Sequence, residues 1–163
     1  MFDEIKIDWR SYSIHDENNI KGFFGDYMWL SNFEKCEILY DGVIYPSSEN
    51  AYQAAKIIPE DRGDFVKLSA YQTKKTWRHY IPLYPDTVIW DSIKYSVMYG
   101  ILWDKFTRHD YLKENLLSTD DKYLEETNHW QDIFYGYDYK LGGKNNLGKI
   151  LMEIREKIKS NKS

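Results

Sequence analysis

The pair Asp41-Gly42 constrains the fold more than any other local feature of the sequence. Asp and Gly both tolerate the positive φ angles that a two-residue type I′ turn requires. The run Cys36–Tyr40 precedes this pair and the run Val43–Tyr45 follows it, and both runs are rich in residues that favour strands. The sequence therefore predicts an antiparallel β-hairpin over these residues.

A helix is predicted directly after the hairpin, over about residues 48–58. A serine at its start supplies the N-cap, and Pro59 ends it. At about 100° per residue, the small apolar side chains form one stripe along the helix. The members of this stripe are Ala51, Ala54, Ala55 and Ile58.

The opposite face of this helix carries Glu49, Gln53 and Lys56, which lie within about 60° of one another. Such a face is typical of a solvent-exposed stripe. A glutamate in the first turn is also stabilised by the helix dipole, by about 0.3–1 kcal/mol. The pattern alone therefore leaves Glu49 open between a structural and a chemical role.

Three more helices follow from the spacing of apolar residues. The longest spans about residues 87–106, a short one runs from Asp110 to Leu117, and an amphipathic helix lies near the end of the chain. The apolar positions of the longest are Trp90, Ile93, Val97, Met98, Ile101 and Leu102, and those of the last are Leu147, Ile150, Leu151, Ile154 and Ile158. Residues 122–127 favour a strand, and glycines punctuate a loop over residues 136–143.

The organisation of the chain is that of one domain, because no linker, repeat or low-complexity run divides its 163 residues. The sequence predicts a helix-rich α+β domain over residues 1–163, with a small antiparallel hairpin or sheet. A chain of this length can bury a core without covalent staples. Cys36 is its single cysteine, so we expect no disulfide framework.

Composition limits the partners. The mean hydropathy is −0.68, and no apolar run approaches the roughly 18–20 residues that span a bilayer. The acidic start, Met1–Glu4, does not resemble a signal peptide, so we expect a cytoplasmic protein without a membrane partner. The net charge of −4 argues against general nucleic-acid binding, which needs many cations. The basic stretch Lys140–Ser163 fits a solvated helix end better than a phosphate-binding patch.

Aromatic residues make up 17% of the chain, with 15 Tyr and 6 Trp. This is more ring area than a core of this size needs, and planar ligands such as bases stack on such rings. Asp132 stands among Trp130, Phe134 and Tyr135. An acid in such surroundings is either a loop cap or a carboxylate in a pocket where its pKa matters. The four histidines are scattered, so we expect no metal site.

Several blocks of the sequence, in order over about residues 22–156, resemble those of the NADAR (YbiA-like) family. The blocks are Phe23–Phe33, Asp41-Gly42 with Tyr45–Lys56, Trp90–Lys94 with Val97-Met98, Lys105-Phe106, Leu116–Thr119, Asp132–Gly136 and Gly143–Arg155. Their order and spacing together are specific. Two features depart from the family pattern. Tyr135 stands where a tryptophan is usual, and residues 74–85 lack the Gly-Arg pair and the arginine that often precedes the family's tryptophan, which leaves Arg78 as the nearest cation in the sequence.

The resemblance implies an N-glycosidase that hydrolyses the bond between a ribose, as ADP-ribose or phosphoribose, and an amine or nucleobase. The implied substrates are nucleotide-like small molecules such as phosphoribosylamino-pyrimidines of riboflavin synthesis, or ADP-ribosyl-guanine, free or within nucleic acid. No cofactor is implied. Glu49 and Asp132 would be the catalytic carboxylates. The residues that would bind substrate are Asn32, Phe33, Lys56, Trp90, Trp130, Tyr135, Gly136 and Asn145.

Some of these residues have structural alternatives. Trp90 equally suits the core of the long helix, and Asn145 suits the N-cap before Leu147. Lys56 could contact phosphate or ribose, act as an amine nucleophile, or form an ion pair. The competing function is a non-catalytic module that binds ADP-ribose or a nucleotide through the same pocket. If one site exists, Glu49, Lys56, Trp90 and Asp132 should converge on it. The oligomeric state is left open.

Overall fold

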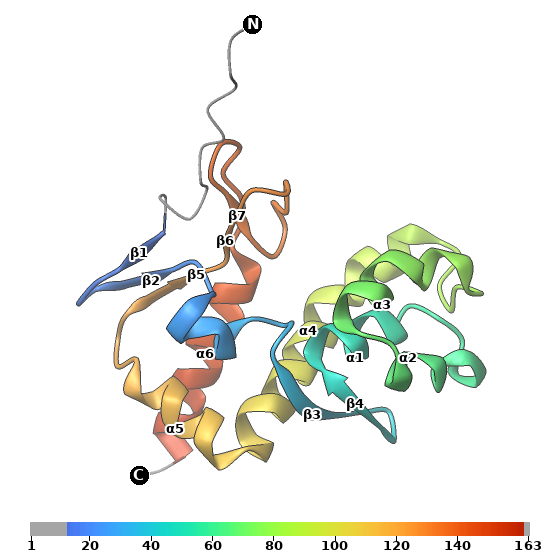
Figure 1. Cartoon of the computed structure of the whole chain (residues 1–163), viewed down its shortest axis with the longest axis horizontal. Coiled ribbons are helices and arrows are strands. Elements are labelled where there is room, and N and C mark those ends of the chain that lie inside the picture. Colours follow the sequence, from blue (N-terminus) through green and yellow to red (C-terminus); the bar gives the residue numbers. More distant parts are fainter. Residues whose placement is uncertain (1–12, 162–163) are drawn as a thin grey trace, which may run out of the picture. The chain divides into compact units, whose positions relative to one another are not determined.

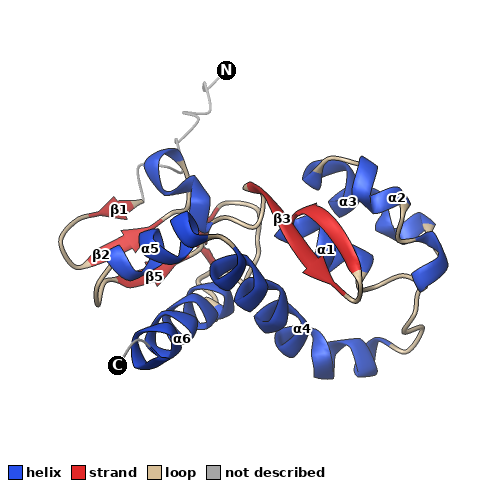
Figure 2. Cartoon of the chain, turned by 90° about the horizontal axis from the view of Figure 1, so that it is seen from below, coloured by secondary structure: helices blue, strands red, loops and turns tan. Residues whose placement is uncertain are grey.

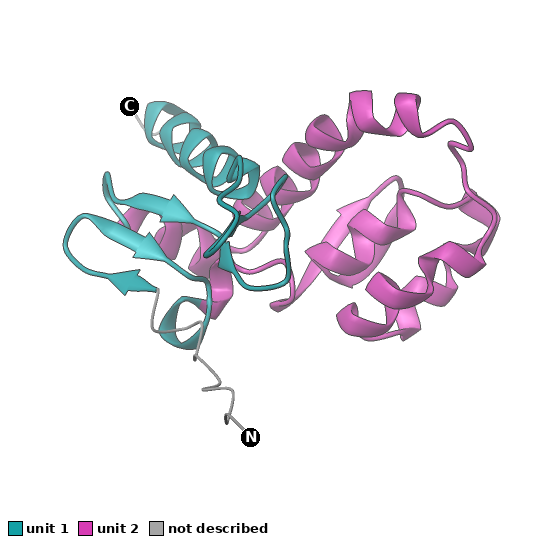
Figure 3. Ribbon diagram, turned by 90° about the horizontal axis from the view of Figure 1, so that it is seen from above, with its two compact units in different colours: residues 1–27, 119–163 teal, residues 28–118 magenta. Residues whose placement is uncertain are grey.

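The computed structural model describes residues 13–161, and Figure 1 labels their helices and strands. Contacts within the chain divide it into two compact units (Figure 3): unit 1, residues 1–27 and 119–163, and unit 2, residues 28–118. The acidic segment Met1–Glu4 and the cation Lys162 lie outside the described residues. The expectation of a single domain over residues 1–163 stays a prediction.

Unit 2 contains the predicted hairpin. Strands β3 (Lys35–Tyr40) and β4 (Val43–Ser47) pair antiparallel, with Tyr40 opposite Val43. Asp41 and Gly42 have φ angles of 46° and 79°. Because these are the left-handed angles of a type I′ turn, the hairpin prediction is confirmed.

Helix α1 (Ser48–Ala54) follows β4 and packs against both strands of the hairpin (Figure 2). Its N-cap is Ser47, whose Oγ accepts the Asn50 N–H at 3.1 Å, as the sequence predicted. The helix ends four residues before the predicted Ile58. Arg62 explains this early end, because its Nε donates to the carbonyl oxygens of Ala54 at 2.9 Å and Ile57 at 3.3 Å.

The remaining helices of unit 2 are short except for one. They are η2 (Gly25–Leu30, which spans the boundary with unit 1), η3 (Pro59–Asp61), α2 (Asp64–Lys67), α3 (Ala70–Thr76), η4 (Trp77–His79), α4 (Thr87–Arg108) and α5 (Asp110–Ser118). The predicted helices over 87–106 and 110–117 are therefore confirmed. The apolar stripe of α4 is fully buried only in its second half, at Met98, Ile101 and Leu102.

Unit 1 is built on short strands. Strand β2 (Asn19–Lys21) pairs antiparallel with β1 (Ile14–His15) and parallel with β5 (Tyr123–Glu125), and β6 (Thr127–Asn128) pairs parallel with β7 (Tyr137–Asp138). The predicted strand over 122–127 is confirmed as β5 and the start of β6. The β2–β5 pair is parallel because the whole of unit 2 separates these strands along the chain, which leaves ample length for a crossover. The α+β class is thus confirmed, with small sheets that are not all antiparallel.

The C-terminal helix α6 (Asn146–Asn161) packs on β5 (Figure 1) and buries the predicted stripe from Leu147 to Ile158. Gly148 lies at the closest approach. A Cβ at this position would overlap the Leu124 carbonyl oxygen and the Asn145 amide. The glycine therefore lets the helix and the strand pack closely.

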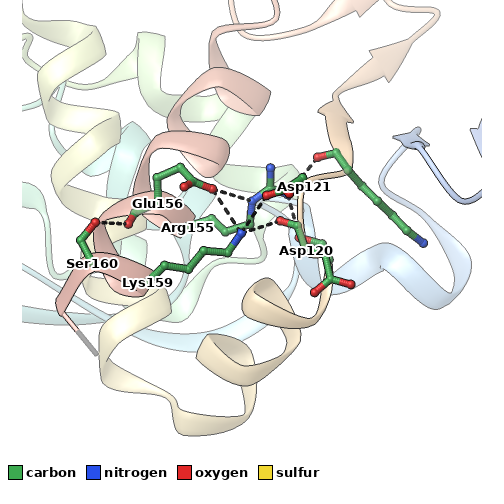
Figure 4. Close-up of polar contacts among 8 residues, drawn as sticks. Asp120, Asp121, Arg155, Glu156, Lys159 and Ser160 are labelled. Carbon is green, nitrogen blue, oxygen red and sulfur yellow. Dashed lines mark hydrogen bonds and ion pairs between the residues drawn. The ribbon is translucent and has the colours of Figure 1, made fainter. Parts of the chain in front are cut away.

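Cations of the basic C-terminal stretch contact residues 119–122 and an acid of the same helix (Figure 4). Arg155 is buried and donates to Thr119 Oγ1 at 2.8 Å and to the Lys122 carbonyl oxygen at 2.9 Å. Lys159 Nζ pairs with Asp121 at 3.1 Å and with Glu156 at 3.3 Å. These contacts favour the interpretation as a helix end over that as a phosphate-binding patch.

Two features of residues 13–161 bear on partners. None of their helices is both long and apolar enough to cross a membrane. Their His, Cys, Asp and Glu side chains form no group of three or more that could hold a metal ion. Independence from metals stays a prediction about activity.

Candidate functional site

Helix α1 buries the side chains that its polar face was expected to expose. Glu49 is 6% exposed and Gln53 is 5% exposed, so the interpretation as a solvent-facing stripe is wrong. Gln53 Nε2 donates to Glu49 Oε1 at 2.7 Å, and the Glu49 N–H donates to the Asn32 carbonyl oxygen at 3.0 Å. The carboxylate is therefore held in a fixed orientation.

Lys56 lies two residues beyond the end of α1, among aromatic rings. Its Nζ is 4.2 Å from the ring centroid of Trp77, 5.1 Å from that of Tyr52 and 5.9 Å from that of Trp90. Trp90 in turn contacts Tyr52 at 5.4 Å and stacks on Tyr84 at 6.0 Å, between ring centroids. We call Tyr52, Trp77, Tyr84 and Trp90 the aromatic cluster. Rings at these distances attract a cation through the negative charge of their faces.

The protonation of Lys56 is shifted. Burial lowers the pKa of Lys56 from its usual 10.5 to about 8, and the Glu49 carboxylate opposes this change without reversing it. The charges of Arg78, Lys94 and Lys74 lower the pKa further. Lys56 forms no ion pair within 4.0 Å with a described carboxylate, so the geometry favours a chemical or binding role over a structural ion pair.

Three other cations, Arg78, Lys94 and Lys74, act electrostatically on Lys56. From the sequence, only Arg78 was named as a candidate cation. Lys74 on α3 and Lys94 on α4 are far from Lys56 in the sequence, so only the fold shows that their charges act on the Lys56 amine. Sequence reasoning also missed Tyr52, Trp77 and Tyr84 of the aromatic cluster. The sequence could have indicated two of them, because Tyr52 is next to Gln53 and Trp77 is next to Arg78.

Two residues that hydrogen-bond to Glu49, Asn32 and Gln53, have side-chain oxygens that accept no hydrogen bond from the described residues. Asn32 is buried, with its Nδ2 3.6 Å from Met98 Sδ, and its Oδ1 accepts no hydrogen bond from the described residues. The same is true of Gln53 Oε1. A buried acceptor without a partner costs about 1–3 kcal/mol, so these atoms suit hydroxyl or N–H donors of a ligand. Phe33 has Lys74 Nζ 5.6 Å from its ring centroid.

Asp132 lies in unit 1 and has the contacts of a loop cap. Its Oδ1 accepts the Tyr135 N–H at 3.0 Å. Its own N–H donates to Asn128 Oδ1 at 3.1 Å, and its carbonyl oxygen accepts from Asn128 Nδ2 at 2.9 Å. Of the two interpretations that the sequence left open, the cap describes the observed contacts.

The other predicted residues of unit 1 differ in exposure. The Trp130 side chain is 44% exposed, whereas Gly136 is buried where a Cβ would overlap the Asn128 amide. Asn145 Nδ2 donates to the Leu124 carbonyl oxygen at 2.9 Å and to the Tyr123 hydroxyl at 3.2 Å, and its Oδ1 accepts the Glu126 N–H at 3.0 Å. Its side chain therefore holds β5 and the residue between β5 and β6, and none of these bonds caps α6.

Sequence reasoning overlooked Asp138, which organises the same loop region. Its carboxylate accepts the N–H groups of Lys140 and Leu141, each at 2.9 Å, and that of Gln131 at 3.0 Å. Burial acts to raise the pKa of Asp138, but these three donors outweigh it and the net shift is downward. The sequence does not show that Asp138 accepts three backbone N–H groups, because the path of the folded loop brings these groups to its carboxylate.

The predicted site residues are thus divided between the units. Asn32, Phe33, Glu49, Lys56 and Trp90 belong to unit 2, and Trp130, Asp132, Tyr135, Gly136 and Asn145 belong to unit 1. Unit 2 by itself brings Lys56 and Trp90 together on the aromatic cluster. Convergence of Glu49 and Asp132 on one pocket stays a prediction.

Comparison with known proteins places these features in a family. The family model described as the NADAR domain matches residues 16–159. The N-glycosidase YbiA of Escherichia coli (strain K12) is 33% identical over 134 residues, which cover 82% of each chain. An N-glycosidase of Nostoc punctiforme is 28% identical over 150 residues, covering 82% of this chain and 87% of that one.

Two further similarities concern length and fold. A riboflavin biosynthesis protein of Vibrio vulnificus is 33% identical over 140 residues, or 80% of this chain, and the chain spans only 35% of its length. The NMR structure of E. coli YbiA matches with a TM-score of 0.76 and 31% identity, covering 94% of this chain and 92% of that one. The match extends over elements of both units.

Proposed function

Because the chain belongs to the NADAR domain family, we propose that it is an N-glycosidase that hydrolyses the bond between a ribose and an amine or nucleobase. Two of its relatives bear the name N-glycosidase. The observation that carries the proposal is the buried, hydrogen-bonded Glu49 on the same short segment as Lys56 and its aromatic cluster.

The chemistry needs a buried carboxylate. When the bond between the ribose C1′ and nitrogen breaks, the electron pair leaves with nitrogen and positive charge develops on the sugar. A carboxylate fixed by Gln53 can stabilise this charge, or take a proton from the water whose oxygen adds to C1′. The leaving amine or base gains a proton. Asn32 and Gln53 offer spare acceptors for ribose hydroxyls.

Lys56 contributes in a way that depends on its proton. With a pKa of about 8, it is mostly an ammonium at pH 7, able to contact a phosphate or a ribose oxygen, with a minor fraction of neutral, nucleophilic amine. The charges of Lys74, Arg78 and Lys94 act in the same region. They support a phosphate-bearing substrate, either a phosphoribosyl or an ADP-ribosyl compound.

In this proposal the second carboxylate is Asp132, and Trp130 and Tyr135 supply stacking surfaces. The support is the family resemblance of Asp132–Gly136 and the exposed ring of Trp130. A cytoplasmic location and a nucleotide-like small molecule, or an ADP-ribosylated base, as partner belong to the same proposal.

The test is mass spectrometry of a substrate panel incubated with the protein. The panel contains ADP-ribosyl-guanosine, ADP-ribosylated DNA, phosphoribosylamino-pyrimidines and NAD. We expect release of a free base or amine from at least one compound by wild type, and strongly reduced release by Glu49→Gln. Glu153→Gln is the matched control, since Glu153 is an exposed acid on α6.

Two outcomes would contradict the proposal. If no compound is cleaved but one binds, and Glu49→Gln binds it equally well, the protein is a non-catalytic nucleotide-binding module. If Glu49→Gln cleaves at the wild-type rate, the carboxylate has no chemical role.

A further inference from the structure

Unit 1 contains a pocket of about 440 Å³ that the proposed function does not use. Its walls include the side chains of Lys21, Tyr123, Glu125, Thr127, Tyr137 and Tyr139. The volume lies within the range of about 300–1,000 Å³ that is usual for small-molecule sites. All of these residues belong to unit 1, so the pocket is defined without reference to unit 2.

The register of the strands builds this pocket. Ile14 on β1 is the partner of Lys21 on β2, and Lys21 is the partner of Glu125 on β5. Paired residues point to the same face of a sheet, so these three side chains form a row across it. The neighbouring Leu124 is buried and points to the opposite face, where α6 packs. Thr127 extends the pocket face and pairs with Tyr137 on β7.

Glu125 is the deepest charged group of the pocket, with only 6% of its surface exposed. Thr127 Oγ1 donates to its Oε1 at 2.8 Å. Lys21 forms no ion pair with it within 4.0 Å, and no other described donor contacts its Oε2. This carboxylate lines the pocket and accepts one hydrogen bond from the described side chains, so it suits a ligand that brings N–H donors.

The walls and rim of the pocket are aromatic and basic. The rings of Tyr123 and Tyr137 are 39% and 41% exposed, which leaves surface for stacking. The Tyr123 hydroxyl accepts from Asn145 Nδ2 at 3.2 Å, which fixes this ring. Lys21 Nζ lies 5.7 Å from the Tyr123 ring centroid. A cation already occupies this face, which argues against a cationic ligand and leaves Lys21 available for an anion.

We propose that this pocket binds a nucleoside monophosphate. The base stacks on the exposed Tyr137 ring and donates an N–H group to Glu125, while the phosphate lies toward Lys21. A ring, a donor edge and an anionic group on one small molecule match the three kinds of surface in the pocket. This binding does not depend on whether the chain is an N-glycosidase, since none of the pocket residues is assigned to that reaction.

The experiment is titration calorimetry of the full chain with the 5′-monophosphates of adenosine, guanosine, cytidine and uridine, and with the four nucleosides. We expect at least one monophosphate to bind. Glu125→Gln should weaken it about tenfold or more, because the amide loses the charge that strengthens the hydrogen bond but still accepts from Thr127. Lys21→Ala should weaken the monophosphate severalfold and leave its nucleoside unchanged.

Controls separate this pocket from unit 2. Lys149→Ala removes an exposed cation of unit 1 outside the pocket and should leave binding unchanged. The methyl NMR signals of Ile14, which lines the pocket, should shift on binding. The proposal is overturned if no monophosphate binds wild type, or if Glu125→Gln and Lys21→Ala both bind as wild type does. Loss of binding in Glu49→Gln with no shift of Ile14 would overturn it too.

Discussion

Polar side chains around Glu49 in unit 2 and around Asp132 in unit 1 differ in how fully they are hydrogen-bonded. Near Asp132, the polar side chains are bonded to backbone: Asn128 and Asp138 each hold several main-chain groups, and Asn145 fixes β5. Around Glu49, the acceptors Asn32 Oδ1 and Gln53 Oε1 have no described donor, and Lys56 is half-buried with no ion pair to a described carboxylate.

This difference indicates what each region stabilises. Satisfied caps stabilise a loop, so their loss should lower the free energy of unfolding. Unsatisfied acceptors and a half-buried amine with a lowered pKa cost stability in the free protein, which is typical of a site that is completed by its ligand. The comparison predicts that removal of the Glu49 charge changes chiefly activity and that loss of a satisfied loop cap in unit 1 lowers stability.

The largest expected effect is that of Glu49→Gln. Loss of the charge should reduce kcat on the order of 100-fold, or about 2.7 kcal/mol, with little change in KM. The melting temperature should move by only a few degrees, since the dipole contribution is at most about 1 kcal/mol. Steady-state kinetics and thermal unfolding measure both. An active, normally folded variant, or one that simply unfolds, would remove the contrast between the units.

Next in size is Gly148→Ala in unit 1. The added Cβ overlaps the Leu124 carbonyl oxygen and the Asn145 amide, so we expect a loss of about 1–3 kcal/mol in the free energy of unfolding. Gly100→Ala on α4 is the matched control, because its Cβ would meet no atom within 4 Å. That change should stabilise the helix by about 0.5–1 kcal/mol. Denaturant unfolding that shows equal effects would refute the close-packing explanation.

Two substitutions of Asp132 separate its possible roles. Asp132→Ala removes the acceptor for the Tyr135 N–H and should cost about 1 kcal/mol of stability. Asp132→Asn keeps an acceptor and removes only the charge, so stability should be nearly unchanged. If Asp132 is the second catalytic carboxylate, both variants lose activity; full activity of Asp132→Asn would make it a loop cap alone.

The smallest effect, and the one with an unusual sign, is that of Lys56→Met. Because the folded-state pKa of Lys56 is lowered to about 8, the charged amine is disfavoured in the fold at pH 7, and its removal should raise the melting temperature by about a few degrees. Wild type gains stability as the pH rises from about 8 to 10.5, where only its unfolded state keeps the proton. The advantage of Lys56→Met should therefore shrink over that range.

Thermal unfolding at pH 7 and pH 9.5 tests this pattern, with Lys149→Met as the control at an exposed lysine. The control should show no comparable gain. A destabilised Lys56→Met protein at pH 7 would mean that the aromatic cluster stabilises the ammonium more than burial penalises it.

The sequence by itself determined features that depend on neighbouring residues. Asp41-Gly42 fixed the hairpin because the turn requires positive φ at two adjacent positions, which few residue pairs tolerate. Ser47 fixed the start of α1 and the apolar spacing fixed α4 and α6, since caps and helical periodicity act over a few residues. The resemblance to the NADAR family likewise rested on motifs that can be aligned along the chain.

Only the tertiary structure decided which faces are covered. Helical spacing placed Glu49 and Gln53 opposite the alanine stripe, but whether that face meets solvent depends on contacts from residues distant in sequence. The gathering of Trp77, Tyr84 and Trp90 near Lys56 has the same origin. The parallel pairing that puts Lys21 beside Glu125 joins strands separated by all of unit 2. Burial and pairing of this kind arise from the whole chain, and local sequence patterns contain no information about them.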